Sequence, residues 1–449
     1  MTAPAKPPIT IFGAGLSGAL LAVRLARAGF DVELHERRPD PRATGAEGGR
    51  SINLALSARG LHALEQVGLA DKIRAQIIPM RGRMIHPVRG PLAYQSYSPR
   101  GDQAINSVSR AGLNLALLEA AAREDRVNIT FDSRCRRVNF ETMETIVEDT
   151  ATGATRSVTP EVVIGADGAF SAVRASMQIR DRFNYQQSYE SHGYKELTIP
   201  PGEGADRFRI DKHALHIWPR RSYMMIALPN NDGSFTCTLF APFEGPDGFD
   251  NIRTPADLRA YFERRFPDAL PLLPTLEDDF FRNPTGSLVT VRCFPWRIGG
   301  RAALIGDAAH AVVPFYGQGM NASFEDVVAL GDRLEQHPHD TDRAFALYEA
   351  DRKPHADALA QLAIDNFIEM RDKVGSPAFR RKKQIEHALA RAFPRAYLPL
   401  YTMVSFSTIP YADAVQRANV QDRIVRAAAL LLCALIVIAL ALLARAIFK

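Results

Sequence analysis

A glycine-rich turn near the N-terminus constrains the fold of this chain more than any other feature. The turn spans Gly13–Gly18, follows the apolar run Ile9–Phe12 and precedes a helical pattern over Ala19–Ala28. Glycines at this spacing allow a tight turn and let a pyrophosphate approach the N-terminus of the following helix. The next predicted strand ends at Glu36, whose carboxylate would accept hydrogen bonds from a ribose diol and repel a 2′-phosphate. The chain therefore begins with a βαβ unit that suits FAD or NAD.

Two later motifs narrow the choice of cofactor. Val162–Gly168 reads as a buried strand that ends in Asp167-Gly168, and Leu304–His310 repeats this pattern around Asp307. A plain NAD dehydrogenase needs neither motif, and together with the glycine turn they resemble the class A flavoprotein monooxygenases. The resemblance implies that Asp307 binds the ribitol of FAD. It also places the backbone of Gly319–Asn321 at a helix N-terminus beside the flavin pyrimidine ring, where the helix dipole would stabilise the negative charge of reduced flavin.

Further segments make the resemblance more specific. Some of them belong to the predicted substrate site and others to the predicted cofactor site. The segments are 49–57, Arg59-Gly60, 80–84, Ser109-Arg110, 314–321 and 399–404. These segments are similar to the signature of the kynurenine 3-monooxygenase family, and the resemblance runs from about Ile9 to Gln421. It implies an FAD-dependent, NADPH-using enzyme that hydroxylates L-kynurenine with O₂ to 3-hydroxy-L-kynurenine through a C4a-hydroperoxyflavin. Such an enzyme belongs to tryptophan degradation and NAD biosynthesis.

The same resemblance supplies candidate site residues. Arg83 and Tyr97 would hold the substrate carboxylate, for which a forked guanidinium is well suited. Asn366 and Tyr401 would make the other polar contacts, and Phe235 and Phe315 would form apolar walls. The expected FAD contacts are Gly13, Gly15, Leu16, Ser17, Gly18, Glu36, Arg37, Arg50, Ala55, Arg110, Asp307, Gly319, Met320 and Asn321. We assign no catalytic acid or base, because the aniline nitrogen itself activates the ring, and the cofactor carries the oxygen chemistry.

The pattern of elements predicts an α/β fold with four parts. These are a Rossmann-like FAD-binding domain of the class A monooxygenase type, an inserted antiparallel-sheet substrate domain, a C-terminal helical region and a C-terminal hydrophobic helix. The sheet domain is predicted from alternating strand-like runs between Arg207 and Phe243. The expected boundaries are 7–75, 105–180 and 290–365 for the FAD-binding domain, 76–104 and 181–289 for the sheet domain, 366–426 for the helical region and 427–444 for the last helix.

The last helix predicts a membrane anchor. Ala427–Ala444 contains no charged residue and is flanked by Arg426 and Arg445. A helix of this length reaches roughly 27 Å, close to the thickness of the bilayer hydrocarbon. Arg417 and Arg423 precede it, and positive charge on that side favours a catalytic domain on the cytoplasmic face of the membrane. The alternative is a helix that docks on the protein.

Composition excludes other classes of function. The net charge of +5 includes no long basic block, so we expect no nucleic-acid partner. The four cysteines are widely separated, which argues against a zinc site or a disulfide framework, and we predict no metal. Two alternatives stay open. One is a related flavin hydroxylase or oxidoreductase acting on another aromatic or lipid substrate, and the other is a non-catalytic, membrane-tethered flavin-binding protein. The sequence does not predict the oligomeric state.

Overall fold

The computed structural model describes residues 5–44, 53–98, 101–204, 206–370 and 377–447, and a parallel sheet forms the core of its N-terminal part. This sheet has six strands, and only its edge pair is antiparallel. The strands in spatial order are β18 (Arg297–Ile298), β19 (Ala302–Leu304), β12 (Val162–Gly165), β1 (Ile9–Phe12), β2 (Val32–His35) and β8 (Val127–Thr130). The predicted βαβ unit is confirmed, since α1 (Leu16–Arg27) connects β1 to the neighbouring parallel strand β2.

The glycine turn between β1 and α1 is tightly packed. Gly13 has a φ of +103°, and a Cβ there would lie 2.4 Å from the carbonyl oxygen of Ala166. A Cβ at Gly18 would lie 1.9 Å from the carbonyl oxygen of Gly13. Both positions therefore require glycine, because a side chain would separate α1 from the strand that it packs against.

Smaller sheets and helices complete the FAD-binding part. One three-stranded sheet contains β9 (Ser133–Val138), β10 (Thr145–Asp149) and β11 (Thr155–Val158), and another contains β3 (Asn53–Leu56), β4 (Ile78–Met80) and β7 (Ile105–Ser109). The helices are α2 (Pro41–Thr44), α3 (Ala58–Gln66), α4 (Ala70–Arg74), α5 (Arg110–Ala121), α6 (Ala172–Met177), α9 (Asp307–His310) and α10 (Gly319–Gln336). A single apolar cluster joins α1, α5 and α10 to the parallel sheet.

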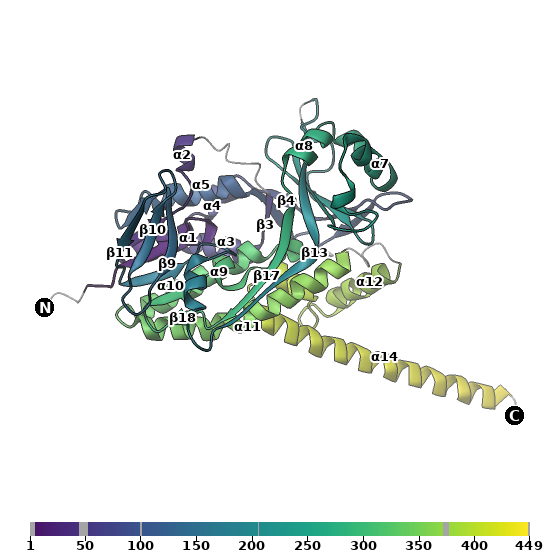
Figure 1. Ribbon diagram of the computed structural model, residues 1–449. Coiled ribbons are helices and arrows are strands. Elements are labelled where there is room, and N and C mark those ends of the chain that lie inside the picture. The colour runs from purple at the N-terminus through teal and green to yellow at the C-terminus, as the bar shows by residue number, and fades with distance from the viewer. Residues whose placement is uncertain (1–4, 45–52, 99–100, 205, 371–376, 448–449) are drawn as a thin grey trace.

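The second large sheet stands beside the first in Figure 1 and has seven strands. In spatial order they are β17 (Gly286–Phe294), β13 (Asn184–Ile199), β16 (Phe235–Pro242), β15 (Met224–Pro229), β14 (Ala214–Pro219), β5 (Gly82–Ile85) and β6 (Ala93–Ser96). The antiparallel sheet predicted from the sequence is confirmed, with one parallel pair between β14 and β5. Because β17 belongs to this sheet, the boundary expected between 289 and 290 falls inside a strand.

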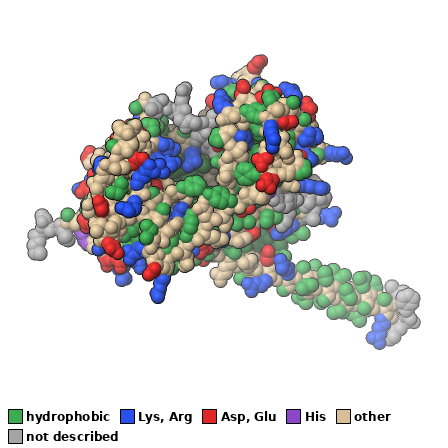
Figure 2. Space-filling view, in the orientation of Figure 1, with side chains coloured by type: hydrophobic (Ala, Val, Ile, Leu, Met, Phe, Trp, Pro, Cys, Tyr) green, Lys and Arg blue, Asp and Glu red, His purple; other side chains and the backbone are tan. Residues whose placement is uncertain are grey.

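Helices cover one face of this sheet and build the C-terminal part. α7 (Pro255–Arg265) and α8 (Leu276–Arg282) pack on the sheet with the short 3₁₀ turns Phe249–Asn251 and Leu270–Leu272. The C-terminal helices are α11 (Thr341–Ile368), α12 (Pro377–Ala392), α13 (Leu400–Phe406) and α14 (Tyr411–Ile447). Figure 1 shows that the distal half of α14 extends away from the rest of the molecule. Figure 2 shows that this half is covered with hydrophobic side chains.

Candidate active site

A cavity of about 570 Å³ lies between the two large sheets. Its walls come from both parts of the molecule, and Figure 2 shows a recess between them that is bordered by Lys and Arg side chains. The glycine turn and the end of β2 line one end of the cavity, whereas Arg83 and Tyr401 line the other. The arrangement therefore brings most of the predicted nucleotide residues and three of the predicted substrate residues, Arg83, Phe315 and Tyr401, into one continuous space.

The nucleotide end has room for a dinucleotide where one is expected. No atom lies within 4 Å of the position that a Cβ would take at Gly15, so the backbone is open to the cavity at the N-terminus of α1. Glu36 follows β2 and is held in place, since its Oε2 accepts a hydrogen bond from the amide of Ala14 at 2.9 Å. Asp167 also lines the cavity, and its Oδ1 is buried without a hydrogen-bond partner among the described residues. Open backbone, a fixed carboxylate and an unpaired acceptor fit the phosphates and ribose of FAD.

The flavin end is formed by the start of α9 and the start of α10. Asp307 begins α9, and Gly319 and Met320 begin α10; all three line the cavity. Asn321, the next residue, does not line the cavity, and its side chain is fully buried and bonded to protein. Its Oδ1 accepts from the amide of Ser57 at 3.0 Å, and its Nδ2 donates to the carbonyl of Ala55 at 2.8 Å.

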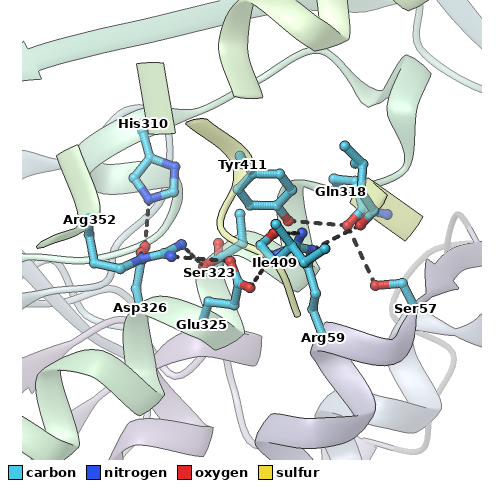
Figure 3. Close-up of polar contacts among 12 residues, drawn as sticks. Ser57, Arg59, His310, Gln318, Ser323, Glu325, Asp326, Arg352, Ile409 and Tyr411 are labelled. Carbon is cyan, nitrogen blue, oxygen red and sulfur yellow. Dashed lines mark hydrogen bonds and ion pairs between the residues drawn. The ribbon is translucent and has the colours of Figure 1, made fainter. Parts of the chain in front are cut away.

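A buried carboxylate joins these two helix starts. Asp326 on α10 accepts hydrogen bonds from the amide of Gly306 at 3.0 Å and from Nε of Arg352 at 2.7 Å, and it contacts the ring of His310 (Figure 3). Burial alone would raise the pKa of Asp326, but the neighbouring His310 and Arg352 hold it below its usual value. The carboxylate therefore stays charged and fixes the residue that precedes Asp307 relative to α10.

A second buried charge attaches the C-terminal segment to the flavin end. The Arg59 side chain is completely buried, pairs with Glu325 on α10 and donates to the carbonyl of Val404 at 2.9 Å (Figure 3). Its guanidinium lies 4.0 Å from the ring centroid of Tyr411. The Tyr411 hydroxyl in turn donates to Oε1 of Gln318 at 3.1 Å, immediately before α10 begins. These contacts connect the first residue of α14 with the start of α10.

Arg83 on β5 dominates the other end of the cavity. It is 7% exposed, and its guanidinium lies 4.7 Å from the ring centroid of Tyr401 and 5.8 Å from that of Tyr97. Burial opposes its charge, but Tyr401, Tyr97 and Glu369 raise the pKa of Arg83 above its usual value. No carboxylate among the described residues forms an ion pair with Arg83, and its Nε has no hydrogen-bond partner among them. The site therefore presents a desolvated cation beside two tyrosines and near Glu369, with no carboxylate of the described residues in direct contact.

The other predicted substrate residues are placed less uniformly. Phe315 and Tyr401 line the cavity. Tyr97 stacks on Tyr401 with ring centroids 5.5 Å apart, and Asn366 lies behind the wall, where its Nδ2 donates to the carbonyl of Phe315 at 2.6 Å. Phe235 is not in the wall, contrary to expectation. It is fully buried on the opposite face of β16, against Phe208.

The correction for Phe235 follows from strand alternation, since successive side chains on a strand point to opposite faces. Thr238 and Phe240 of the same strand line the cavity. Met370, which follows α11, also lines it and had no motif to mark it in the sequence. Knowing which face of β16 is buried against α7 would have identified Phe240 as the wall residue.

The remaining predicted cofactor residues divide into three groups. Leu16, Ser17, Arg37, Ala55 and Arg110 line the cavity, as do Gly13, Gly15 and Glu36. Gly18 instead serves the packing of α1 against Gly13. Arg50 lies outside the described residues. Within the described ranges, no group of three or more His, Cys, Asp or Glu side chains is arranged to hold a metal ion.

Comparison with known proteins defines the relatives of this chain. Residues 6–363 match the family model of the FAD binding domain. The chain is 50% identical over 425 residues to a kynurenine 3-monooxygenase of Myxococcus xanthus, covering 95% of this chain and 91% of that protein. It is 46% identical to a kynurenine 3-monooxygenase of Dictyostelium discoideum, covering 91% of this chain and 90% of the other.

Solved structures share the fold at lower identity. A tetrameric 2-methyl-3-hydroxypyridine-5-carboxylic acid oxygenase superposes with a TM-score of 0.67 at 22% identity, covering 88% of this chain and 99% of that one. The tetracycline destructase Tet(51) superposes with a TM-score of 0.62 at 19% identity, covering 91% of this chain and 100% of the other. At such identities the likeness establishes the α/β fold, which agrees with the fold class predicted from the sequence.

Proposed function

Because this chain belongs to the kynurenine 3-monooxygenase family and carries its FAD-binding domain, we propose that it hydroxylates L-kynurenine at carbon 3 with Arg83 as the residue that binds the substrate carboxylate. The enzyme is an FAD-dependent hydroxylase, with NADPH and O₂ as co-substrates. Bound FAD, once reduced, supplies activated oxygen to the electron-rich carbon ortho to the aniline nitrogen. The protein supplies the position of the substrate, a shielded cavity and fixed charge.

The observation that carries this proposal is the buried Arg83, which forms no direct ion pair with a carboxylate of the described residues. A guanidinium removed from water is stable only beside an acceptor that compensates its charge, and a forked contact with a carboxylate is the strongest such pairing. The hydroxyls of Tyr97 and Tyr401 lie beside the guanidinium and would donate to the same carboxylate. Glu369 is close enough to raise the pKa of Arg83, and it offers an acceptor for the α-ammonium group.

The apolar part of the cavity suits the aromatic ketone. Phe240 and Phe315 face one another with ring centroids 4.9 Å apart, and Met224 and Leu288 line the same region. Burial raises the pKa of Tyr316 well above its usual value, so its hydroxyl stays protonated. A dry wall on one side and Arg83 on the other would orient the ring toward the start of α10, where the flavin is expected.

The test is NADPH oxidation with product identification. The purified protein should oxidise NADPH rapidly only when L-kynurenine is present, and mass spectrometry should identify 3-hydroxykynurenine. Stopped-flow measurement of flavin reduction should show acceleration by the substrate. Rapid oxidation with a different aromatic acid, and none with kynurenine, would refute the substrate assignment.

Variants of Arg83 test its role directly. Replacing Arg83 with Ala should raise the KM for kynurenine by a factor of about 10² or more, because a charge-assisted contact in a desolvated site is worth about 3–5 kcal/mol. Arg83→Lys keeps the charge but loses the fork, so it should recover part of the loss. The protein should stay yellow in both variants. An unchanged KM in a folded, FAD-loaded Arg83→Ala protein would contradict the carboxylate role.

We also propose that α14 anchors the enzyme in a membrane, with the catalytic part on the cytoplasmic face. Its apolar stretch has a mean hydropathy of 3.0, and none of it is buried against the rest of the described chain. Contiguous exposed leucines and isoleucines of this length fit a bilayer rather than water. Deleting everything after Arg426 should release the protein from membranes. A full-length protein that is soluble after lysis without detergent would contradict the anchor.

A further inference from the structure

The segment from α12 to α13 combines basic and apolar side chains on its solvent side. Residues 381–395 contain five Lys or Arg residues and one acidic residue, Glu386. Arg381 and Lys382 are exposed, and Ile385 and Phe393 are each 57% exposed. Large apolar side chains between cations are typical of helices that lie on an anionic lipid surface.

This segment is attached to α14 just before the proposed membrane span. The amide of Leu398 donates to Oε1 of Gln421 at 2.7 Å, and Nε2 of Gln421 donates to the carbonyl of Leu398 at 3.1 Å. Tyr397 precedes Leu398, and burial and then the charges of Glu386 and Asp422 raise the pKa of its hydroxyl to about 12. Figure 1 shows α12 beside the proximal half of α14.

The position of this attachment fixes the depth of the segment. Gln421 is six residues before Ala427, where the uncharged stretch begins, which corresponds to about 9 Å along the helix axis. The headgroup layer of a bilayer is roughly 6 Å thick on each side of the hydrocarbon. If α14 spans the bilayer, Leu398, which follows α12, is therefore held just outside the lipid headgroups, within roughly 3 Å of that layer.

The exposed residues of these two attached segments form what we call the basic collar. It comprises exposed cations and apolar side chains of the α12 segment and the exposed arginines of proximal α14, namely Arg381, Lys382, Ile385, Arg391, Phe393, Arg395, Arg417, Arg423 and Arg426. We propose that the basic collar lies on an anionic membrane surface, a contact that rests on the membrane anchor of the proposed function. Lipid is favoured over a protein partner because the collar is continuous with the apolar helix, and its cations outnumber the exposed acidic residues of proximal α14, Asp413 and Asp422.

The helix α12, which carries part of the collar, also packs against the active site through its buried side. Phe379 of α12 is 7% exposed and packs in the same apolar cluster as Phe367, Met370 and Phe315. Met370 and Phe315 line the cavity. Lipid contact would therefore steady the helix that supports the proposed substrate wall.

The test uses the full-length protein reconstituted in vesicles of phosphatidylcholine, with or without about 30% phosphatidylglycerol. Flotation measures the anchor, and hydrogen exchange of residues 381–395 measures the collar. Each cation at an anionic surface strengthens binding about fivefold, so exchange should slow about fivefold or more with phosphatidylglycerol and recover in high salt. The variant Arg381→Glu, Lys382→Glu, Arg395→Glu should float but lose this slowing.

The control variant places the same charge changes far from the collar. Arg123 follows α5, Arg137 lies on β9 and Arg156 lies on β11, and all three are exposed. These elements are on the other side of the molecule from α14 in Figure 1, so changing all three residues to Glu should leave the slowing intact. If the protein floats but residues 381–395 exchange at the same rate in both kinds of vesicle, the proposed lipid contact of the collar is wrong and the membrane anchor is still supported. Failure to float with either vesicle would overturn the anchor itself. If the slowing of hydrogen exchange depends on the number of protein molecules per vesicle and not on lipid charge, the collar binds a second copy of this chain instead of lipid.

Discussion

Arg59 offers a test of how the C-terminal segment completes the substrate site. Besides its contacts with Glu325 and Val404, it donates to the carbonyls of Met403 at 3.2 Å and of Ile409. It therefore holds the middle of α13, the helix that carries Tyr401 into the cavity, and the segment that follows this helix. Arg59→Met keeps most of the apolar stem but removes the charge and every one of these donors.

The expected effect follows from the burial of this cation. Removing one partner of a buried ion pair costs about 3–5 kcal/mol, because the other charge is left without compensation. A loss of about 3 kcal/mol shifts the balance between docked and undocked α13 by about 150-fold. The KM for kynurenine should therefore rise by a factor of up to that size. FAD should stay bound, because the glycine turn and Glu36 do not depend on Arg59.

The assay compares KM, kcat and FAD content in wild type, Arg59→Met and Arg59→Lys. The lysine variant keeps the charge beside Glu325 but cannot reach three carbonyls, so its KM should be intermediate. Arg74→Met is the matched control, since Arg74 is 45% exposed and its surface ion pairs contribute only about 0–1 kcal/mol. If Arg59→Met is folded, binds FAD and keeps KM within about twofold of wild type, Arg59 does not position α13.

Two further predictions concern the glycine turn and acid stability. Gly13→Ala should destabilise the whole protein, because its Cβ would lie 2.4 Å from the carbonyl oxygen of Ala166 at a φ of +103°. Gly15→Ala should fold normally but lose FAD affinity, because its Cβ would enter the open cavity. Thermal unfolding and FAD titration distinguish the two variants, and an equal loss of stability in both would contradict the distinction. Burial lowers the folded-state pKa of His35 and His216 from 6.5 to about 4, so the unfolded chain binds more protons between these values and stability is lost as pH falls through this window. When the pH falls from 6.5 to 5, each histidine should lower the free energy of unfolding by about 2 kcal/mol. The Tm should therefore drop less in His216→Asn than in the wild type. An equal drop in Tm in that variant would contradict this assignment.

The sequence predicted the parts of this fold that depend on local rules. The βαβ unit at Gly13–Gly18 required only the order of strand, turn and helix, and the structure confirms it. The antiparallel sheet followed from alternating runs, although alternation does not say which face is covered. That is why Phe235 was expected in the cavity wall, while Thr238 and Phe240 line it. The face is decided by α7 and α8, which lie later in the chain and pack against Phe235.

The parts that could not be predicted depend on contacts between distant segments. Arg59 and Val404 are 345 residues apart, and Gly306 and Asp326 meet only because α10 returns across the start of α9. Each buried charge is satisfied by backbone carbonyls or amides, which no sequence pattern records. These contacts have one consequence in common: they fix backbone at the start of α9, at the start of α10 and in the middle of α13, where the cofactor and the substrate are expected. The residues that touch ligand could be named from motifs, but the residues that hold them in place required the fold.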